Sequence, residues 1–579
     1  MRTLVTVQAW ARNPILSTPR LDAEYYLAWA GDIASGDVAG RSGIVGGGPF
    51  LLNPLYAYVI APLVGAFGAT PVPVLVMQAL LAAATTALAA AAAKRWAGST
   101  AAWVAGLAVA FSTALTHLDG YVAVSGLAAF LVAGACFACS PSANGKEQGH
   151  GPVAAGVWLG LSALARPVVL FALPFVAWLF ARRDERRARA ATLVLLPFAL
   201  FAAVSFARNV AVSGESVVYT AANGQNLYIG NNTAARRMRA MFTDEFRFAP
   251  REMHEDAKFR VAVDLSREPT RSEVSSWYAA RAVNELTQHP AASLGWYLQK
   301  LRWFFSPEEP ASSADLEFDR GLTPMLRLAF VPTWVLAAFC VAAAIVCRNR
   351  RDLLLGPGAL VLAHLVACTL SFPLSHYRSP AIPAMAVLAG CAVAAVAGGL
   401  RSGQGRPLVV VATSVVLVAI VGRIDPQPAY RRDQLLLNAA VAELGVGNWG
   451  AAERNARDAL AIDPQSLNAL AVLMDAARMS GSPATARPFA QQLIVAQPWN
   501  PNFKVQLARI DLAGGRRQEA LTSMDRIVAQ FPWSADLRMR RAELRADAGD
   551  LRGADEDARW ARDRGVDLEP WLAEKLRVR

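Results

Sequence analysis

Long runs without charge constrain this chain more than any other feature. Runs of about 20 apolar residues can cross a hydrocarbon core of about 30 Å as helices. Such runs are found at residues 73–93, 99–116, 120–139, 190–207, 325–347, 353–371, 380–398 and 407–423. Only 18% of the residues are charged, where a soluble domain has about a quarter. The sequence therefore predicts a multi-pass membrane protein and excludes a disordered chain, a coiled coil and a small disulfide scaffold.

Two parts of the chain depart from this pattern. The apolar stretch 152–181 is interrupted by Arg166-Pro167, and proline disfavours helix continuation while arginine is costly at mid-membrane. We expect two short helices that meet near one membrane face. From Asp425 onward no run is long enough to span, so the last quarter of the chain is expected outside the bilayer.

Basic clusters set the orientation of the spans. They are Lys94-Arg95, then Arg182-Arg183 with Arg186-Arg187 and Arg189, then Arg348 with Arg350-Arg351, then Arg401 and Arg406. One topology places all of them in the cytoplasm, as the positive-inside rule requires. The segments 117–120, 208–322 and 374–380, and everything after Val421, are then extracytoplasmic. Most of the net charge of +12 follows from this topology, so a nucleic-acid surface is disfavoured.

The beginning of the chain is less regular. Residues 50–69 are apolar but contain prolines and tyrosines, which suits an interfacial helix. Residues 1–20 hold no signal peptide and no span, although Asp22 onward is expected outside, so we expect that a first transmembrane helix is missing. The predicted parts are 1–72 (first outer segment), 73–207 (transmembrane core), 208–322 (outer loop), 323–423 (late transmembrane helices) and 424–579 (repeat domain).

The C-terminal segment repeats at a period of 34 residues. The marks are Gly447, Gly481, Gly515 and Gly549; Ala452, Ala486, Ala520 and Ala554; and Pro464, Pro498 and Pro532. Small residues at fixed positions let the two helices of a hairpin pack closely, and proline closes each unit. The first unit, GNWGAAERNARDALAIDP, resembles the tetratricopeptide repeat. This resemblance implies an α-solenoid that binds a protein partner or an acceptor, whose identity the sequence does not reveal.

Asp22 and Glu24 stand just before an amphipathic stretch in the first outer segment. A carboxylate here can act as a general base on a hydroxyl, or coordinate a divalent cation that holds a phosphate leaving group. The alternative is a helix N-terminus, where acidic residues interact favourably with the helix dipole. The residues themselves leave both interpretations open.

Several short motifs resemble the GT-C glycosyltransferases, and in particular the bacterial group related to protein O-mannosyltransferases and lipid A aminoarabinose transferases. They are Asp22-x-Glu24-Tyr25, Pro54-Leu55-Tyr56, Phe67-Gly68, Gly160 to Pro167 (GLSALARP), Arg208-Asn209, Gly224 to Asn232, and His376-Tyr377-Arg378-x-Pro380. Their order and membrane side agree with the topology above. The missing first helix is the main departure.

The resemblance implies a polyprenyl-phosphate sugar donor, Asp22 as the catalytic residue, and Glu24 as a helper or metal ligand. Arg166 and Arg378 are candidates to neutralise the donor phosphate, although snorkelling or a structural ion pair would also explain them. His376 is a candidate to contact phosphate or acceptor, or a structural histidine. Three residues of the Gly224–Asn232 run, Asn226, Tyr228 and Asn231, are candidates to bind sugar; a tight turn is the alternative.

The sequence thus predicts an all-α protein, a transmembrane helical bundle followed by an α-solenoid. The favoured function is a glycosyltransferase in a bacterial inner membrane, acting on a lipid, glycan or protein acceptor, with its repeats on the periplasmic side and a divalent metal as a possible cofactor. One alternative is an enzyme like the O-antigen ligases or polymerases, which works through Arg and His in a late outer loop. Another is a non-catalytic membrane scaffold that presents the repeats.

Overall fold

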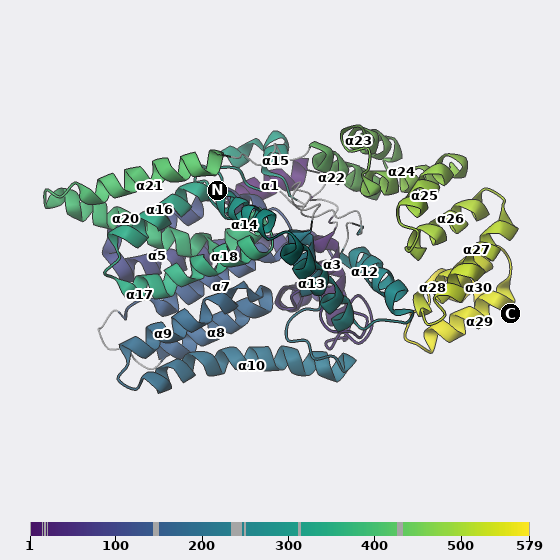
Figure 1. The fold of residues 1–579 in the computed structure, drawn as a ribbon, viewed down its shortest axis with the longest axis horizontal. Coiled ribbons are helices and arrows are strands. Elements are labelled where there is room, and N and C mark those ends of the chain that lie inside the picture. Colours follow the sequence, from purple (N-terminus) through teal and green to yellow (C-terminus); the bar gives the residue numbers. More distant parts are fainter. Residues whose placement is uncertain are drawn as a thin grey trace. The chain divides into compact units, whose positions relative to one another are not determined.

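The computed structural model describes residues 2–13, 16, 19, 21–142, 150–232, 246–247, 250–310, 314–424 and 432–577. Within these residues the chain is helical, mostly α with a few short 3-10 and π segments, apart from turns and one isolated bridge between Ser112 and Val331, which confirms the predicted all-α fold class (Figure 1). It divides into two compact units. The membrane unit comprises Met1–Met241 and Tyr278–Tyr430, and the repeat unit comprises Phe242–Trp277 and Arg431–Arg579.

The membrane unit contains the apolar helices. Five helices in the described residues are long and apolar enough to cross a membrane: α5 (Pro71–Ala110), α10 (Arg187–Ser213), residues 351–370, residues 375–401 and α21 (Arg406–Arg423). Shorter apolar helices accompany them: α4 (Leu55–Phe67), α7 (Val124–Cys139), α8 (His150–Ala165) and α16 (Thr333–Val346). These helices indicate a multi-pass membrane protein. The predicted runs 73–93 and 99–116 both fall largely within α5, which is broken at Ala97 and Gly98.

The remaining elements of this unit are short or polar. They are α1 (Arg2–Arg12), α3 (Asp22–Ala34), α6 (Thr113–Leu118), η1 (Pro167–Phe171), α9 (Leu173–Arg183), α11 (Asn223–Asn231), α13 (Arg271–Gln288, at the boundary between the units), α14 (Pro290–Phe304), α15 (Leu316–Leu322) and η3 (Pro324–Leu328). The late spans are built from α17 (Arg351–Leu353), η4 (Leu354–Gly358) and α18 (Ala359–Leu370), and from α19 (Ser375–Arg378), η5 (Ser379–Ala381) and α20 (Ile382–Arg401).

The Arg166-Pro167 pair separates two short helices, as the sequence predicts. Arg166 has an extended backbone (φ −156°, ψ 116°), because the residue before a proline is disfavoured in the α region. Helix α8 therefore ends at Ala165, and the chain continues through η1 into α9. The break leaves the Arg166 side chain at one end of an apolar helix.

Close helix packing in this unit depends on small residues. A Cβ added at Gly156 of α8 would collide with the carbonyl oxygen of Val194 in α10, and one added at Gly390 of α20 would collide with that of Ala101 in α5. Small residues let helix backbones approach in this way inside membranes, where van der Waals packing replaces the hydrophobic driving force. The α8–α10 and α5–α20 pairs hold the scaffold that carries the candidate site.

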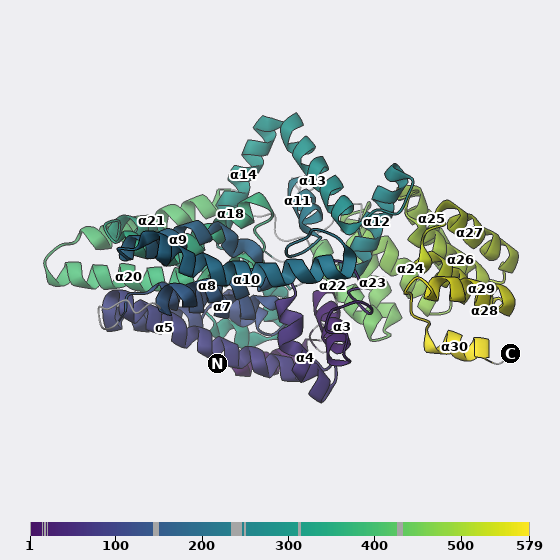
Figure 2. The ribbon, with the colours of Figure 1, turned by 90° about the horizontal axis from the view of Figure 1, so that it is seen from below.

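The repeat unit is a series of paired helices (Figure 2). They are α22 (Arg432–Gly445), α23 (Trp449–Ile462), α24 (Leu467–Met479), α25 (Pro483–Ala496), α26 (Pro501–Ala513), α27 (Arg517–Gln530), α28 (Ala535–Asp547), α29 (Leu551–Arg562) and α30 (Pro570–Arg577). The four glycines of the 34-residue period have φ between +77° and +86°, a left-handed conformation that glycine adopts at low cost. The four alanines of the period are fully buried. The predicted helical repeats are confirmed.

The repeat unit also contains a helix from far upstream. Helix α12 (Pro250–Leu265) lies in sequence between α11 and α14, within the predicted outer loop, yet it clusters with the repeats. Its Phe259 is buried in a hydrophobic cluster with residues of α26, α27 and α28.

Candidate active site

Asp22 begins α3 and remains accessible to solvent. Although part of the residue is exposed, desolvation of the carboxyl by the surrounding protein raises its pKa, and the nearby Arg166 guanidinium opposes that rise. Glu24 lies in the same first turn and is also exposed. The predicted helix N-terminus is therefore present. The structure also brings Asp22 within the electrostatic influence of Arg166, 144 positions later in the sequence.

The backbone just before Asp22 is strained. Leu21 has φ 58° and ψ −126°, a conformation that costs a residue with a side chain about 1–3 kcal/mol. No side chain caps the start of α3, so the strain is not the by-product of a capping hydrogen bond. Such strain persists only where the surrounding structure holds the backbone in place. The strained residue directly precedes Asp22 at the start of α3.

Arg166 is almost fully buried and packs on an aromatic ring. Its guanidinium carbon lies 4.5 Å from the centre of the Tyr377 ring, and the rings of Tyr377 and His376 are 4.4 Å apart. The Nε atom of Arg166 has no hydrogen-bond partner among the described residues. A buried guanidinium N–H without an acceptor is costly, so this cation is poised for an anionic oxygen.

Two tyrosines, Tyr26 of α3 and Tyr56 of α4, lie near Asp22 and Arg166. Burial raises the pKa of Tyr26, and the negative charge of Asp22 raises it further. The Tyr26 ring lies edge-on to that of Tyr56, with 5.0 Å between centroids. Tyr56 in turn donates a 2.5 Å hydrogen bond to Gln78. We call Asp22, Tyr26, Arg166, His376 and Tyr377 the Asp22–Arg166 cluster.

Arg378 is placed differently from Arg166, although both were candidates for the same role. It is fully buried, and its Nη1 and Nη2 atoms donate to the backbone carbonyls of Trp303, Phe304, Ser306 and Glu308. It also pairs with the Glu309 carboxylate at 2.8 Å. The contacts match the alternative of a structural ion pair.

Glu309 completes this buried pair. Although burial favours its neutral form, the Arg378 guanidinium and hydrogen bonds from Thr333 and Ser375 hold the pKa of Glu309 below its usual value. The Thr333 and Ser375 hydroxyls donate at 2.5 Å and 2.8 Å. The pair joins the segment after α14 to the start of the span that carries His376 and Tyr377.

The Gly224–Asn232 run forms a helix, α11, so the predicted alternative of a tight turn is wrong. Asn231 is buried and its amide donates to the carbonyls of Leu227 and Leu370, both at 2.8 Å. The Tyr228 ring lies 5.3 Å from that of Tyr278. Asn226 is half-buried on the same helix. Of these candidates, Asn231 is engaged in joining helices.

Lys300 of α14 is not among the candidates drawn from the sequence. It is fully buried. Its Nζ donates to Asn231 Oδ1 at 2.9 Å, to the Ser371 carbonyl at 3.0 Å and to the Gly230 carbonyl at 3.3 Å. Because burial disfavours the charged form, the pKa of Lys300 falls to about 7. Helix α14 mixes Trp, Tyr, Lys and Arg, and this composition does not indicate that its lysine is buried.

A second buried polar cluster was also missed. Asp319 of α15 lies 2.6 Å from His117 Nε2 and accepts hydrogen bonds from Tyr121 at 2.5 Å and Asn13 at 2.7 Å. Beside it, Arg2 of α1 pairs with Asp119 at 2.6 Å. Through Asn13 and Arg2, these contacts join the N-terminal segment to α15 and to the turn after α6.

The side chains that could bind a metal ion are few near Asp22. Among the described residues, no three His, Cys, Asp or Glu side chains are grouped as a metal site requires. Asp22 and Glu24 are two positions apart in α3, and residues at that spacing do not face each other on a helix. A metal ion at Asp22 and Glu24 therefore stays a prediction from the sequence.

The helix α12 makes specific contacts in the repeat unit. Asp256 is fully buried and accepts hydrogen bonds of 3.0 Å from both Asn500 and Asn502. Arg247 adds a bidentate pair, with Nη2 2.9 Å from Asp256 Oδ1. The Phe259 ring packs against those of Phe531 and Trp533.

Comparisons with known proteins give likenesses of fold at low identity. No protein-family model matches the sequence, and no curated protein matches it. ArnT from Cupriavidus metallidurans bound to undecaprenyl phosphate is 17% identical, with 85% of this chain and 78% of that chain covered and a TM-score of 0.38. The Archaeoglobus fulgidus oligosaccharyltransferase with Zn and sulfate is 14% identical, with 78% and 56% covered and a TM-score of 0.33.

A third solved structure also matches the chain at low identity. A tetratricopeptide repeat protein from Parabacteroides merdae is 12% identical, with 56% of this chain and 96% of that chain covered and a TM-score of 0.23.

Proposed function

We propose that this chain is an integral-membrane glycosyltransferase. It moves a sugar from a polyprenyl-phosphate donor to a hydroxyl of a lipid, glycan or protein acceptor on the extracytoplasmic side of a bacterial inner membrane. The observation that carries the proposal is the Asp22–Arg166 cluster, in which an accessible carboxylate lies near a buried guanidinium at the end of an apolar helix. A base beside an anion site is what transfer from a lipid phosphate to a hydroxyl requires.

In this mechanism Asp22 is the general base. Its carboxylate takes the proton of the acceptor hydroxyl as the hydroxyl oxygen forms a bond to the anomeric carbon of the sugar. The bond between that carbon and the phosphate oxygen breaks, and its electron pair leaves with the polyprenyl phosphate. A raised pKa makes the carboxylate a better proton acceptor at neutral pH, since efficient bases titrate near the working pH.

Arg166 binds the phosphate in the same scheme. Its guanidinium is held over Tyr377, which fixes its direction, and its unpaired Nε supplies a hydrogen bond to a phosphate oxygen. Positive charge at this point stabilises the negative charge that develops on the leaving group. His376 and Tyr377 are positioning residues, and Asn226 and Tyr228 remain candidates to contact sugar. Arg378 and Asn231 hold the helices that carry the site.

The repeats are proposed to bind a partner protein or the acceptor. The surface formed by Asn500, Asn502 and Arg540 already holds α12, because Arg540 contacts both Asn502 and Glu255. A partner must therefore use another surface or displace α12. No step of this mechanism is assigned to a metal ion, and a divalent cofactor stays a prediction from the sequence.

Donor turnover tests the proposal. The full chain is reconstituted in liposomes with a panel of polyprenyl-phosphate sugars and an acceptor extract, and release of polyprenyl phosphate is measured for the wild type, Asp22→Asn and Glu317→Gln. Glu317 is an exposed carboxylate paired locally with Arg320, so it is a matched control. We expect turnover to fall at least a hundredfold in Asp22→Asn alone.

Two other outcomes contradict the proposal. Equal turnover in all three proteins removes the role of Asp22 and favours the ligase-like alternative. No turnover of any donor by a folded wild-type protein favours a scaffold that presents the repeats.

A further inference from the structure

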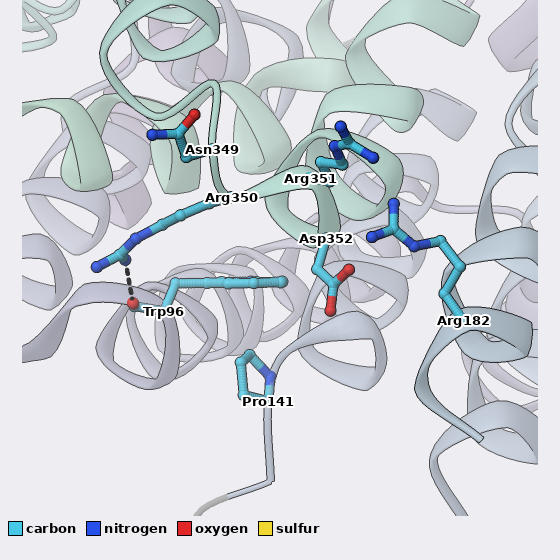
Figure 3. Close-up of a pocket in the computed structure, with 7 residues that line it drawn as sticks. All are labelled: Trp96, Pro141, Arg182, Asn349, Arg350, Arg351 and Asp352. Carbon is cyan, nitrogen blue, oxygen red and sulfur yellow. Dashed lines mark hydrogen bonds between the residues drawn. The ribbon is translucent and has the colours of Figure 1, made fainter. Parts of the chain in front are cut away.

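A recess lies at the opposite ends of the apolar helices from the Asp22–Arg166 cluster. It has a volume of about 550 Å³ and is lined by Trp96, Pro141, Arg182, Asn349, Arg350, Arg351 and Asp352 (Figure 3). Arg351 begins the 20-residue span 351–370, which at 1.5 Å per residue extends about 30 Å. His376 and Tyr377 follow the far end of that span. The recess and the candidate site are therefore about one membrane thickness apart.

The recess collects residues from basic clusters that are distant in sequence. Arg182 lies in the last turn of α9, and Arg350 and Arg351 stand at the start of α17. Trp96 stands next to the break in α5. The sequence predicts that these clusters face the cytoplasm, because each terminates an apolar run on the side richest in Lys and Arg. The fold brings three of these arginines around one hollow.

Positive charge in the recess is only partly neutralised. Asp352 pairs with Arg183 at 2.8 Å, and Arg183 also donates to the Cys139 carbonyl. Arg350 donates to the Trp96 carbonyl at 2.8 Å, a neutral partner. Among the described residues, the guanidinium groups of Arg182 and Arg351 have no hydrogen bond or ion pair. Asp352, the carboxylate that lines the recess, is thus already paired with Arg183. The positive charges of Arg182, Arg350 and Arg351 remain without a carboxylate in the lining.

We propose that this recess binds the phosphate headgroup of an anionic phospholipid from the cytoplasmic leaflet. Guanidinium groups form bidentate hydrogen bonds with phosphate, and Arg182 and Arg351 are both available to do so. Trp96 and Pro141 supply apolar wall beside them, as suits the junction between headgroup and acyl chain, where tryptophan is enriched. Basic pockets between helices on the cytoplasmic side are suited to anionic lipids. A soluble phosphate shares the headgroup chemistry but would not use the apolar wall.

Lipid binding to the purified full-length protein tests this assignment. Native mass spectrometry in detergent measures the affinity for phosphatidylglycerol and for phosphatidylcholine in the wild type, in Arg182→Gln/Arg351→Gln and in Arg186→Gln/Arg189→Gln. The second variant removes the same charge from exposed arginines of the same cluster that do not line the recess. We expect phosphatidylglycerol binding to weaken about 30-fold in the first variant and less than threefold in the second. Phosphatidylcholine binding should not change.

Three results would overturn the assignment. An equal loss in both double variants would mean that surface charge alone attracts the lipid. Unchanged binding in the recess variant, with thermal unfolding like that of the wild type, would remove the recess as the site. Displacement of phosphatidylglycerol by glycerol phosphate at equal concentration would assign the recess to a soluble phosphate.

Discussion

Asn500 of the repeat unit donates a 3.0 Å hydrogen bond to Asp256, a residue 244 positions earlier in the chain. The acceptor carboxylate is fully buried, and its other partners are Asn502 and Arg247. The repeats therefore recognise a specific helix of their own chain through a charged group.

Asp256→Ala should loosen α12 from the repeats. The change leaves Arg247 and two amides without their buried acceptor, which costs about 3–5 kcal/mol. Hydrogen exchange in the full chain should show faster exchange in residues 250–265 and at the start of α26. Asp264→Ala removes an exposed carboxylate that pairs with Arg260 of the same helix, and it should leave this exchange unchanged. Equal protection in both variants would contradict a specific role for Asp256.

The pH dependence of donor turnover should report Asp22. A base must be deprotonated, so turnover should fall as the pH drops through the raised pKa of Asp22. Arg166→Gln removes the cation that opposes this rise, so the acid limb should move to higher pH and the KM for donor should increase. Arg166→Lys should restore the position of the limb more than the KM, because lysine keeps the charge but not the planar donors. If the acid limb of the pH profile in Arg166→Gln stays at the wild-type pH, Arg166 does not influence the pKa of the catalytic base.

Lys300 should make stability depend on pH above neutrality. Burial lowers its pKa to about 7 in the folded protein, from the ordinary lysine value of 10.5 that applies to the unfolded chain. Between these two pH values the unfolded chain therefore binds more protons than the folded protein. Stability should therefore rise with pH across this window, by about 2–3 kcal/mol from pH 7 to 9. Thermal unfolding of wild type and Lys300→Met at several pH values measures it. The methionine variant should lack this rise, and an identical slope in both proteins would contradict the assignment.

Glu309→Gln should be more harmful to folding than to chemistry. It leaves the buried Arg378 charge with only carbonyl partners, which costs about 3–5 kcal/mol. The apparent Tm should fall, while the KM for donor of the folded fraction stays near that of the wild type. A large rise in KM without loss of Tm would instead indicate that the Arg378–Glu309 pair contacts the donor.

Local patterns predicted most of the architecture. Apolar run length gave the long helices, and the spacing of Gly447, Gly481, Gly515 and Gly549 gave the repeat turns, because both signals are properties of neighbouring residues. The Arg166-Pro167 break followed from proline stereochemistry. These features need no knowledge of distant contacts.

The differences between similar candidates could not be predicted in this way. Arg166 and Arg378 both end apolar segments, yet the partners of Arg378 lie 70–75 positions earlier in the chain. Asp256 resembles any exposed acid in a polar helix, and only the packing of α12 on α26 buries it. Contacts between distant segments decide which charges are structural and which stay available.

The docking of α12 also constrains how the chain is threaded through the bilayer. A helix from the segment between α11 and α14 and the repeats after α21 belong to one compact unit, so both must lie in the same aqueous compartment. The number of membrane crossings between them must then be even. Three long apolar helices follow α14, at residues 351–370, at residues 375–401 and in α21, so a fourth crossing is needed, and we expect the shorter apolar helix α16 to supply it. Any insertion error that skipped one of these crossings would separate Asp256 from Asn500 by a membrane, so assembly of the repeat unit acts as a check on correct topology.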